Sequence, residues 1–402
     1  MSGQMNAQLA RQVLDRLQSR QAEIEKFIQA LVEVESPSGD EEGSRAVIDL
    51  LVETAGTLEC VNEIDRVDVP DFGQHLVVRA FQEQSDAGQI LLVGHTDTVH
   101  ARGSLSERPW RREAGKIYGP GIFDMKANCA LAIEVLRALS ELQAKPECAV
   151  TLALTCDEEV GSLSGWPFLE QIANSRDTRC ALVMEPPASG GRVKTGRKGT
   201  GIFAIKVEGK AAHAGLEPEK GASAILELAR QTEQLHAINL SGSGITLNVG
   251  VIHGGTRSNV VPAQAEGEID VRFSTEAESL EIERILSNLK PVDERTKVFV
   301  SGGINRPPME RTAAVIQLFE KAQAIAAQIG FDLGEAQVGG ASDGNFLAAM
   351  GIPVLDGLGI SGDGAHAEHE HIEADDIARR GALIAGLVQS SSFSLCEKQP
   401  KG

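Results

Sequence analysis

The chain has 402 residues, of which 57 are acidic and 38 are basic, giving a formal net charge of −19. This length favours two structural units, and a hydrophobic content of 42% excludes a disordered chain. The acidity argues against binding to nucleic acid, which needs clustered lysine and arginine, and against an anionic membrane surface.

The N-terminal segment 1–34 is typical of an amphipathic helix, because leucine, valine and isoleucine recur there at helical spacing. It has no apolar core of a secretion signal, and no apolar run in the chain reaches the roughly 18 residues of a membrane helix. The six cysteines include no C-x-x-C pair, which favours reduced thiols. We therefore expect a cytoplasmic protein that has no membrane partner.

Short apolar runs alternate with helical segments from about residue 45 to 200, and one more run follows near the C-terminus. The runs that we expect to form strands are 89–94, 148–155, 180–184 and 352–357. Because these runs are apolar on both faces, helices should cover both sides of their sheet. Residues 125–142, between the first two runs, show helical spacing of apolar side chains. The pattern predicts an α/β fold with a mainly parallel sheet.

Residues 200–308 have a different pattern. Alternating strand segments and helical segments follow one another there in the order β-α-β-β-α-β, which is typical of a small split two-layer α+β domain. After residue 308, the helical segments resemble those of the α/β pattern that precedes residue 200. We therefore predict a discontinuous α/β domain, residues 1–199 and 309–402, interrupted by an inserted α+β domain at residues 200–308.

Potential ligands follow three of the apolar runs directly. His95 and Asp97 come after the first run, Glu158 and Glu159 after the second, and Glu185 after the third. The carboxyl ends of parallel strands meet at one edge of a sheet, where α/β proteins place their active sites. These side chains should therefore lie close together.

Two further segments could contribute ligands to the same edge. The glycine-rich turn "GPGIFDMK" delivers Asp124 at a helix start, and "GDGAHAEHEHI" contains His366, His369 and His371. Each feature has an ordinary alternative: Asp124 could be a helix N-cap, the paired glutamates a solvated turn, and each histidine a plain polar residue. Taken together, two imidazoles and three carboxylates are the ligand set of a pair of zinc ions.

Eight motifs resemble, in order and over nearly the whole chain, those of one zinc metallopeptidase family. They are "GHTDTV", "YGPGIFDMK", "DEEVGS", "MEP", "AAHAG", "GGTRSNVVP", "IDVRF" and "AHAEHEHI". The family contains aminoacylases, acetylornithine deacetylase, succinyl-diaminopimelate desuccinylase and glutamate carboxypeptidases of the carboxypeptidase G type, and the last branch is the most similar. The resemblance implies a catalytic dizinc domain and an inserted lid domain through which two subunits form a homodimer.

The resemblance also implies a role for each ligand. Asp124 would bridge two zinc ions, with His95 and Glu159 completing one ion and Glu185 and His366 the other. Cobalt or manganese could replace zinc with these ligand types.

Family spacing selects His366 as the ligand and leaves His369 and His371 in solvent or in a supporting position. Glu158 would be the general base that activates water. Asp97, two residues after the ligand at position 95, would accept the imidazole N–H and fix its tautomer. The resemblance further implies a cis peptide bond after Asp124.

The remaining predicted residues contact the substrate. His213 resembles the lid histidine that reaches the site from the partner subunit and stabilises the oxyanion; an exposed loop histidine is its alternative. Arg272 and Asn259 match lid residues that hold the substrate α-carboxylate, which an arginine binds through two parallel hydrogen bonds. An ion pair on an exposed strand face is the alternative for Arg272. We also expect Arg192, which lies in a cationic segment, and Gly340 to contact the substrate.

The predicted function is a dizinc carboxypeptidase that releases an acidic C-terminal amino acid from a peptide or N-acyl substrate. The cationic segment favours an anionic substrate, although it could also pair with surface acids. A deacylase of N-acetyl or N-succinyl amino acids is the enzymatic alternative. A catalytically silent binding protein is the alternative from another class, and it would have lost a ligand or the base, whereas all these positions are filled.

Overall fold

The computed structural model describes residues 2–240 and 244–390, and the chain divides into two compact units. Unit 1 consists of Met1–Thr195, Arg311–Gln337 and Ser342–Gly402. Unit 2 consists of Gly196–Glu310 and Val338–Ala341. Within the described ranges, none of the helices combines the length and the apolar character that crossing a membrane requires.

Unit 1 is built on a six-stranded sheet with the strand order β1-β2-β6-β3-β7-β14. Its strands are β1 (Val61–Val69), β2 (Gly73–Ala80), β3 (Gln89–His95), β6 (Ala149–Thr155), β7 (Thr178–Val183) and β14 (Val354–Leu355). Strand β3 pairs in parallel with β6 and β7, and β14 pairs in parallel with β7, whereas β2 runs antiparallel to β1 and β6. Every residue of β3 and β6 is buried. The predicted mainly parallel sheet, apolar on both faces, is confirmed.

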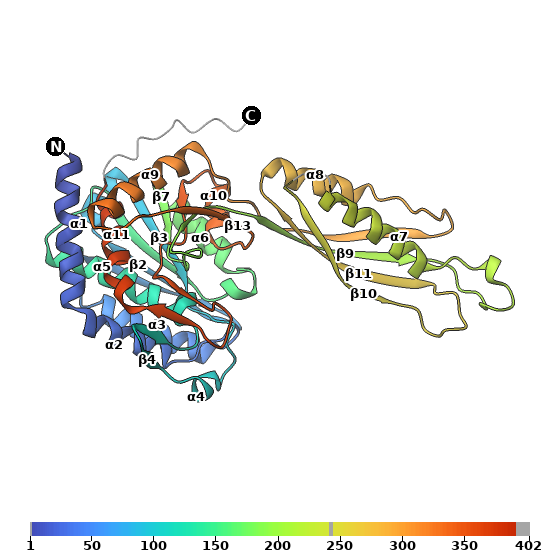
Figure 1. Cartoon of the computed structure of the whole chain (residues 1–402), viewed down its shortest axis with the longest axis horizontal. Helices are drawn as coiled ribbons and strands as arrows, with labels where there is room; N and C mark the ends of the chain where they lie inside the picture. The colour runs from blue at the N-terminus through green and yellow to red at the C-terminus, as the bar shows by residue number, and fades with distance from the viewer. Residues whose placement is uncertain (1, 241–243, 391–402) are drawn as a thin grey trace. The chain divides into compact units, whose positions relative to one another are not determined.

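Helices surround this sheet, and most of them lie between strands in the chain. They are α1 (Ser2–Ser19), α2 (Gln21–Val32), α3 (Glu41–Ala55), α4 (Ser104–Glu107), α5 (Ala127–Glu141), α6 (Gly165–Asn174), α9 (Ala313–Gln328), α10 (Gly344–Ala349) and α11 (Ile377–Gln389). The C-terminal helix α11 packs against α1, α5 and α9, as Figure 1 shows. Residues such as Leu17, Leu131 and Leu383 are fully buried there in one core with the sheet.

Two small sheets complete the strands of this part of the chain. The first has the order β15-β16-β5-β4, from β4 (Arg111–Glu113), β5 (Lys116–Tyr118), β15 (Gly362–Asp363) and β16 (His371–Glu373). The second pairs β8 (Val193–Arg197) with β13 (Glu335–Val338). In the first sheet, β16 pairs with β5, so the segment around residue 370 lies beside the one that leads to Asp124.

Unit 2 is an antiparallel sheet with two helices on one face. Its strands are β9 (Gly199–Glu208), β10 (Thr246–Gly254), β11 (Gln264–Phe273) and β12 (Lys297–Arg306), in the sheet order β10-β11-β9-β12. Its helices are α7 (Ala224–His236) and α8 (Glu276–Ser287), so the chain order is the predicted β-α-β-β-α-β. Strand β11 alternates between exposed and buried residues, and its buried face shares a core with both helices. The lid and dimerisation roles of this unit stay predictions.

Glu227 holds a loop of unit 2 from within helix α7. Only 1% of this residue is exposed, and its carboxylate accepts the backbone N–H groups of Val292 and Asp293 at 2.8 and 2.9 Å and the amide of Gln231 at 2.7 Å. Burial alone would raise the pKa of Glu227, but these hydrogen bonds outweigh it and lower the pKa below its ordinary value.

We therefore expect Glu227→Gln to lower the free energy of unfolding by about 1–3 kcal/mol at neutral pH. The reason is that the buried amide NH₂ of the glutamine would face N–H groups that need an acceptor. Urea unfolding, with the exposed Glu233→Gln on the same helix as control, measures this loss. Because the folded pKa is depressed, the contribution is complete above the unfolded pKa of about 4.3 and disappears as the pH falls through the folded pKa. The interpretation fails if both variants unfold like the parent at neutral pH.

Candidate metal centre

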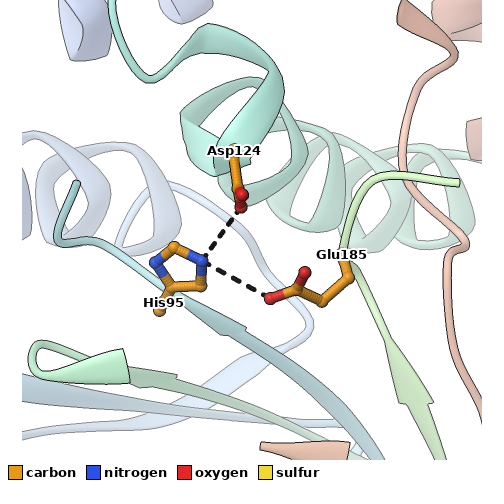
Figure 2. A group of neighbouring side chains, drawn as sticks. All are labelled: His95, Asp124 and Glu185. Carbon is orange, nitrogen blue, oxygen red and sulfur yellow. Dashed lines mark hydrogen bonds and ion pairs between the residues drawn. The ribbon is translucent and has the colours of Figure 1, made fainter. Parts of the chain in front are cut away.

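Two groups of ligand atoms lie at the carboxyl edge of the main sheet in unit 1. The first contains His95, Asp124 and Glu185, and the second contains Asp124, Glu159 and His366; in each group the ligand atoms lie within 4.8 Å of one another. In the first group, Nε2 of His95 lies 3.2 Å from Oδ1 of Asp124 and 3.4 Å from Oε1 of Glu185 (Figure 2). The predicted ligands are thus brought together.

Asp124 belongs to both groups and presents a different oxygen to each. Its Oδ1 faces His95, whereas its Oδ2 lies 3.4 Å from Nε2 of His366. The same His366 nitrogen lies 3.2 Å from Oε2 of Glu159. A carboxylate that offers one oxygen to each of two ligand groups is arranged to bridge two cations.

The sheet topology explains the first group. His95 is the last residue of β3, and Glu185 follows the end of β7, which pairs with β3 in parallel. The carboxyl ends of two neighbouring parallel strands lie at the same edge, so the two side chains converge. Asp124 precedes helix α5, whose N-cap position is occupied by Lys126, so the N-cap alternative for Asp124 is wrong. The bond between Asp124 and Met125 is cis, as the resemblance implies.

One expectation is corrected by these groups. The resemblance paired His95 with Glu159, and Glu185 with His366, whereas the structure places Glu185 with His95 and Glu159 with His366. The physical reason is that Glu159 lies in a short turn of 3-10 helix, Glu158–Val160, beyond the end of β6. The turn carries this side chain away from the strand edge and towards His366.

Asp97 holds that turn in place. Its carboxylate accepts the backbone N–H of Glu158 at 3.2 Å, the backbone N–H of Glu159 at 3.1 Å and the hydroxyl of Ser38 at 2.6 Å. Nδ1 of His95 lies 2.9 Å from the main-chain carbonyl of Asp97 and 3.4 Å from its carboxylate. The expected contact with the carboxylate is therefore secondary, and the carbonyl is the closer acceptor of the imidazole N–H.

His95 donates its Nδ1 proton to this carbonyl and turns Nε2 towards two carboxylates, so Nε2 needs either a second proton or a bound cation. Burial opposes a charge on His95, yet the carboxylates of Asp124, Asp97 and Glu185 raise its pKa well above the ordinary value. In the second group, hydrogen bonds to Asp124 and then Glu159 raise the pKa of His366 to about 10. Both imidazoles lie in surroundings that demand positive charge.

Glu159 provides an independent test of whether a cation fits. Its Oε1 is buried and has no hydrogen-bond partner within the described ranges 2–240 and 244–390. Burial raises the pKa of Glu159, because a charged carboxylate is poorly solvated there. A divalent cation would satisfy this oxygen, and imidazole nitrogen with carboxylate oxygen is a ligand set that zinc accepts. The residues present therefore fit a pair of divalent cations.

The backbone of His366 supports its assignment. Its φ of 64° lies in the left-handed region, which a non-glycine residue occupies at a cost and which is concentrated at functional sites. His371 is turned elsewhere: its Nε2 lies 2.9 Å from Nζ of Lys116, and its Nδ1 lies 2.9 Å from the carbonyl of His369. His366, rather than its two neighbours, is thus the histidine that meets Asp124.

Glu158 lies in the same turn as the candidate ligand Glu159, and only 8% of it is exposed. A solvated turn, the ordinary alternative for this pair of glutamates, would leave both side chains in water, so that alternative is wrong. The role of Glu158 as a base stays a prediction.

The predicted lid residues lie in unit 2. His213 is exposed, and its Nδ1 accepts the backbone N–H of Gly215 at 3.1 Å. The carbonyl of Asn259 accepts the backbone N–H of Ala214 at 3.0 Å, which brings the segments of His213 and Asn259 side by side.

The other residues predicted to contact the substrate form hydrogen bonds with other residues of this chain. Nε and Nη2 of Arg272 each donate to the Asp270 carboxylate at 2.9 Å, so the arginine forms an ion pair within its own strand. Arg192, in unit 1, is exposed and donates to the carbonyl of Ser189 at 2.9 Å. Gly340, in unit 2, accepts a hydrogen bond at 3.1 Å from the guanidinium of Arg197.

Comparisons with known proteins show which chains this one resembles. The family described as peptidase family M20/M25/M40 matches residues 91–390. Carboxypeptidase G2 from Pseudomonas sp. (strain RS-16) is 29% identical over 370 residues, which cover 90% of this chain and 88% of the relative. Succinyl-diaminopimelate desuccinylase from Acidovorax ebreus (strain TPSY) is 28% identical over 326 residues, which cover 76% of this chain and 81% of the relative. The crystal structure of a dinuclear metal binding peptidase of the M20 family from Bacillus subtilis superposes with a TM-score of 0.67 at 16% identity, covering 92% of this chain and 98% of that one. At that identity, the superposition shows the fold alone.

Proposed function

Because the chain belongs to peptidase family M20/M25/M40, we propose that it is a dizinc carboxypeptidase that hydrolyses an amide bond and releases an acidic C-terminal amino acid. Its relatives are hydrolytic enzymes, among them a carboxypeptidase. The observation that carries the proposal is Asp124, whose two carboxylate oxygens face two separate groups of ligand atoms. His95 and Glu185 would hold one ion with Asp124, and Glu159 and His366 would hold the other.

When bound, the two ions would lower the pKa of a water molecule and polarise the substrate carbonyl. Glu158 takes the proton that the attacking water loses as its oxygen forms a bond to the carbonyl carbon. The protonated Glu158 then returns this proton to the nitrogen as the carbon–nitrogen bond breaks. Asp97 fixes the backbone of Glu158 during both transfers, because its carboxylate holds the N–H group of that residue. Zinc is the proposed metal from the ligand types, and cobalt or manganese could take its place.

Unit 2 is proposed to stabilise the oxyanion through His213 of a second subunit, so the proposal includes a homodimer. The N–H of Gly215 already occupies Nδ1 of His213. With Nδ1 accepting this bond, the ring proton lies on Nε2, which can donate to a developing negative charge.

Arg272 is proposed to bind the substrate carboxylate together with Asn259, with Arg192 and Gly340 as further contacts. The pair with Asp270 uses two of the five N–H groups of the guanidinium, and the remaining ones can bind a second carboxylate. The pair also holds the arginine in one orientation, which reduces the entropy lost on binding. This contact would recognise the α-carboxylate of any released amino acid, whereas the cationic segment that contains Arg192 is what favours an acidic side chain.

An N-acyl-amino-acid deacylase is the second candidate, favoured by the similarity to a desuccinylase over 76% of this chain. The same bond is broken in this case, but the acyl group is smaller. A cytoplasmic location is also part of the proposal, and it is supported by five free thiols among the described cysteines, as expected in a reducing compartment.

We expect the zinc-loaded protein to release glutamate from N-benzoyl-glutamate and from p-aminobenzoyl-glutamate. In Arg272→Ala, KM for these compounds should rise about 10–100-fold with little change in kcat, which is the effect of losing a charge-assisted hydrogen bond used equally in ground and transition states. Arg284→Ala is the matched control, because this arginine is exposed on α8 of the same unit and pairs with Glu281.

Detection of the released amino acid by a coupled assay separates the candidates. N-acetyl-methionine, N-acetyl-ornithine and N-succinyl-diaminopimelate complete the panel. If only these three compounds are hydrolysed, and not the glutamate compounds, the deacylase becomes the proposed function in place of the carboxypeptidase. If the protein binds two zinc ions but hydrolyses none of the compounds, both candidate functions are overturned for the substrates of this panel.

A further inference from the structure

We propose that Glu370 is a positioning residue of the metal centre: it fixes the loop that carries the shared ligand Asp124. This inference rests on the proposed dizinc function and extends it to a residue outside both ligand groups. Glu370 lies four positions after the ligand His366, and it is 2% exposed. Its carboxylate is thus removed from water and must be satisfied by the protein.

The loop provides three main-chain donors to this carboxylate. Oε2 of Glu370 accepts the N–H of Gly121 at 2.8 Å, and Oε1 accepts the N–H groups of Phe123 and Asp124 at 2.8 and 2.9 Å. The contact with Asp124 is made by the ligand residue itself. Hydrogen bonds to a charged acceptor are roughly twice as strong as neutral ones, so the loop has little freedom to move its carboxylate.

His100 provides the fourth donor. Its Nε2 lies 2.5 Å from Oε2 of Glu370, and its Nδ1 faces the guanidinium of Arg108, with both terminal nitrogens at 3.5 Å. A guanidinium can only donate, so Nδ1 of His100 is the acceptor and Nε2 bears the proton. The imidazole therefore donates to Oε2 of Glu370, the oxygen that also accepts the N–H of Gly121.

This arrangement links two ligands that are far apart in the sequence. The backbone of Glu370 belongs to the segment that carries His366, and the N–H of Gly119 donates to its carbonyl at 3.4 Å. Its side chain meanwhile binds the loop of Asp124. Glu370 therefore fixes the positions of both Asp124 and His366, whose Oδ2 and Nε2 atoms face each other in the second ligand group. Displacement of this anchor should change the spacing of ligand atoms at both metal positions, because Asp124 is shared.

Glutamine in place of Glu370 tests the anchor with almost no change in volume. Its amide NH₂ must face either the N–H groups of Phe123 and Asp124 or those of Gly121 and His100, so donors oppose donors whichever way it turns. Glu368→Gln is the matched control: it is the same substitution two residues earlier, at an exposed side chain.

The first readout is zinc affinity, measured by competition with a chromophoric chelator, together with the visible absorption of the cobalt-loaded protein. We expect Glu370→Gln to bind zinc about 10–100-fold more weakly at both positions and to alter the cobalt spectrum, as losses of residues behind metal ligands do. Glu368→Gln should match the parent. A lower melting temperature with unchanged zinc affinity and cobalt spectrum would overturn the proposal, because Glu370 would then only stabilise the fold.

The second readout needs no metal. Hydrogen exchange of the amides at residues 121–124 in the metal-free protein should be faster in Glu370→Gln and unchanged in Glu368→Gln. If the parent binds neither zinc nor cobalt, the dizinc function fails, while this exchange still decides whether Glu370 holds the loop; unchanged exchange overturns the anchor. Should Glu370→Gln not fold, His100→Ala removes one of the four donors and should show the same changes to a smaller extent. Parent-like zinc affinity and exchange in His100→Ala would overturn the proposal.

Discussion

Replacement of Glu158 by glutamine is expected to lower kcat for amide hydrolysis by about 10²–10⁴-fold, the usual contribution of a general base, while two zinc ions stay bound. Glutamine has nearly the same shape, but it cannot take a proton from water or return one to the leaving nitrogen. Metal should stay because Glu158 contributes to neither ligand group found among the described residues. The backbone N–H of this residue, which Asp97 accepts, is unaffected by the change.

Initial rates with N-benzoyl-glutamate and metal analysis of the same samples measure this effect. Glu170→Gln serves as the control, since Glu170 is exposed on helix α6. If Glu158→Gln is as active as the parent protein, Glu158 is not the general base. A loss of zinc together with activity would instead make Glu158 a support of the ligand turn.

Removal of the shared ligand should have the second large effect. Asp124→Ala is expected to lose at least one of the two ions and to lower kcat/KM by about 10³-fold or more, because metal ions contribute several kcal/mol and each 1.36 kcal/mol is a factor of ten. The reason is that both ligand groups use this carboxylate. Asp332→Ala, an exposed position of unit 1, is the control.

Single removals of the other ligands test the grouping itself. Glu185→Ala should weaken the ion held with His95, and Glu159→Ala should weaken the ion held with His366, so each should leave one site of near-parental affinity. Metal titration by calorimetry distinguishes the two sites. Two ions bound to Asp124→Ala with parental affinity would contradict the bridging role.

The sequence predicts β3, β6, β7 and β14, because strands buried on both faces have continuous apolar runs. It misses β2, which is almost wholly buried although its segment "GQHLVVRA" contains polar and charged residues. It does not predict β1, whose residues are mostly exposed or half-buried at the edge of the sheet, so that no apolar run marks it. The N-terminal segment reads as one helix, but the chain breaks at Arg20, with φ −108° and ψ 14°, into α1 and α2. Nothing in the apolar spacing of residues 1–34 signals this break.

The members of the two candidate ligand groups could be predicted, because each follows a strand or a glycine-rich turn. Their grouping could not, since β6 and β7 both flank β3 and the sequence does not say which neighbour carries the partner of His95. The geometry of the turn that holds Glu159 decides it. Glu370 was missed for a similar reason: its carboxylate lies among histidines in a polar segment, and its partners lie 246 to 270 residues away.

The run of three carboxylates at residues 157–159 shows the same limit. Glu159 meets His366, whereas Asp157 is fully buried and accepts the N–H and hydroxyl of Ser164 at 2.7 Å. Two acids of one motif therefore differ: Glu159 belongs to a candidate ligand group, whereas Asp157 anchors the following loop. Only the partners, which come from other parts of the chain, distinguish these roles.

The order of the ligands along the chain has a consequence for biosynthesis. A nascent polypeptide has made every member of the first group once Glu185 has been added, whereas the second group waits for His366, after the whole of Gly196–Glu310 has been translated. The anchor Glu370 is made later still, and helix α11, which packs on α1 and α5, follows it. In the proposed centre, therefore, the residues that would hold a second ion are complete only after residue 366 has been made, long after every member of the first group is present.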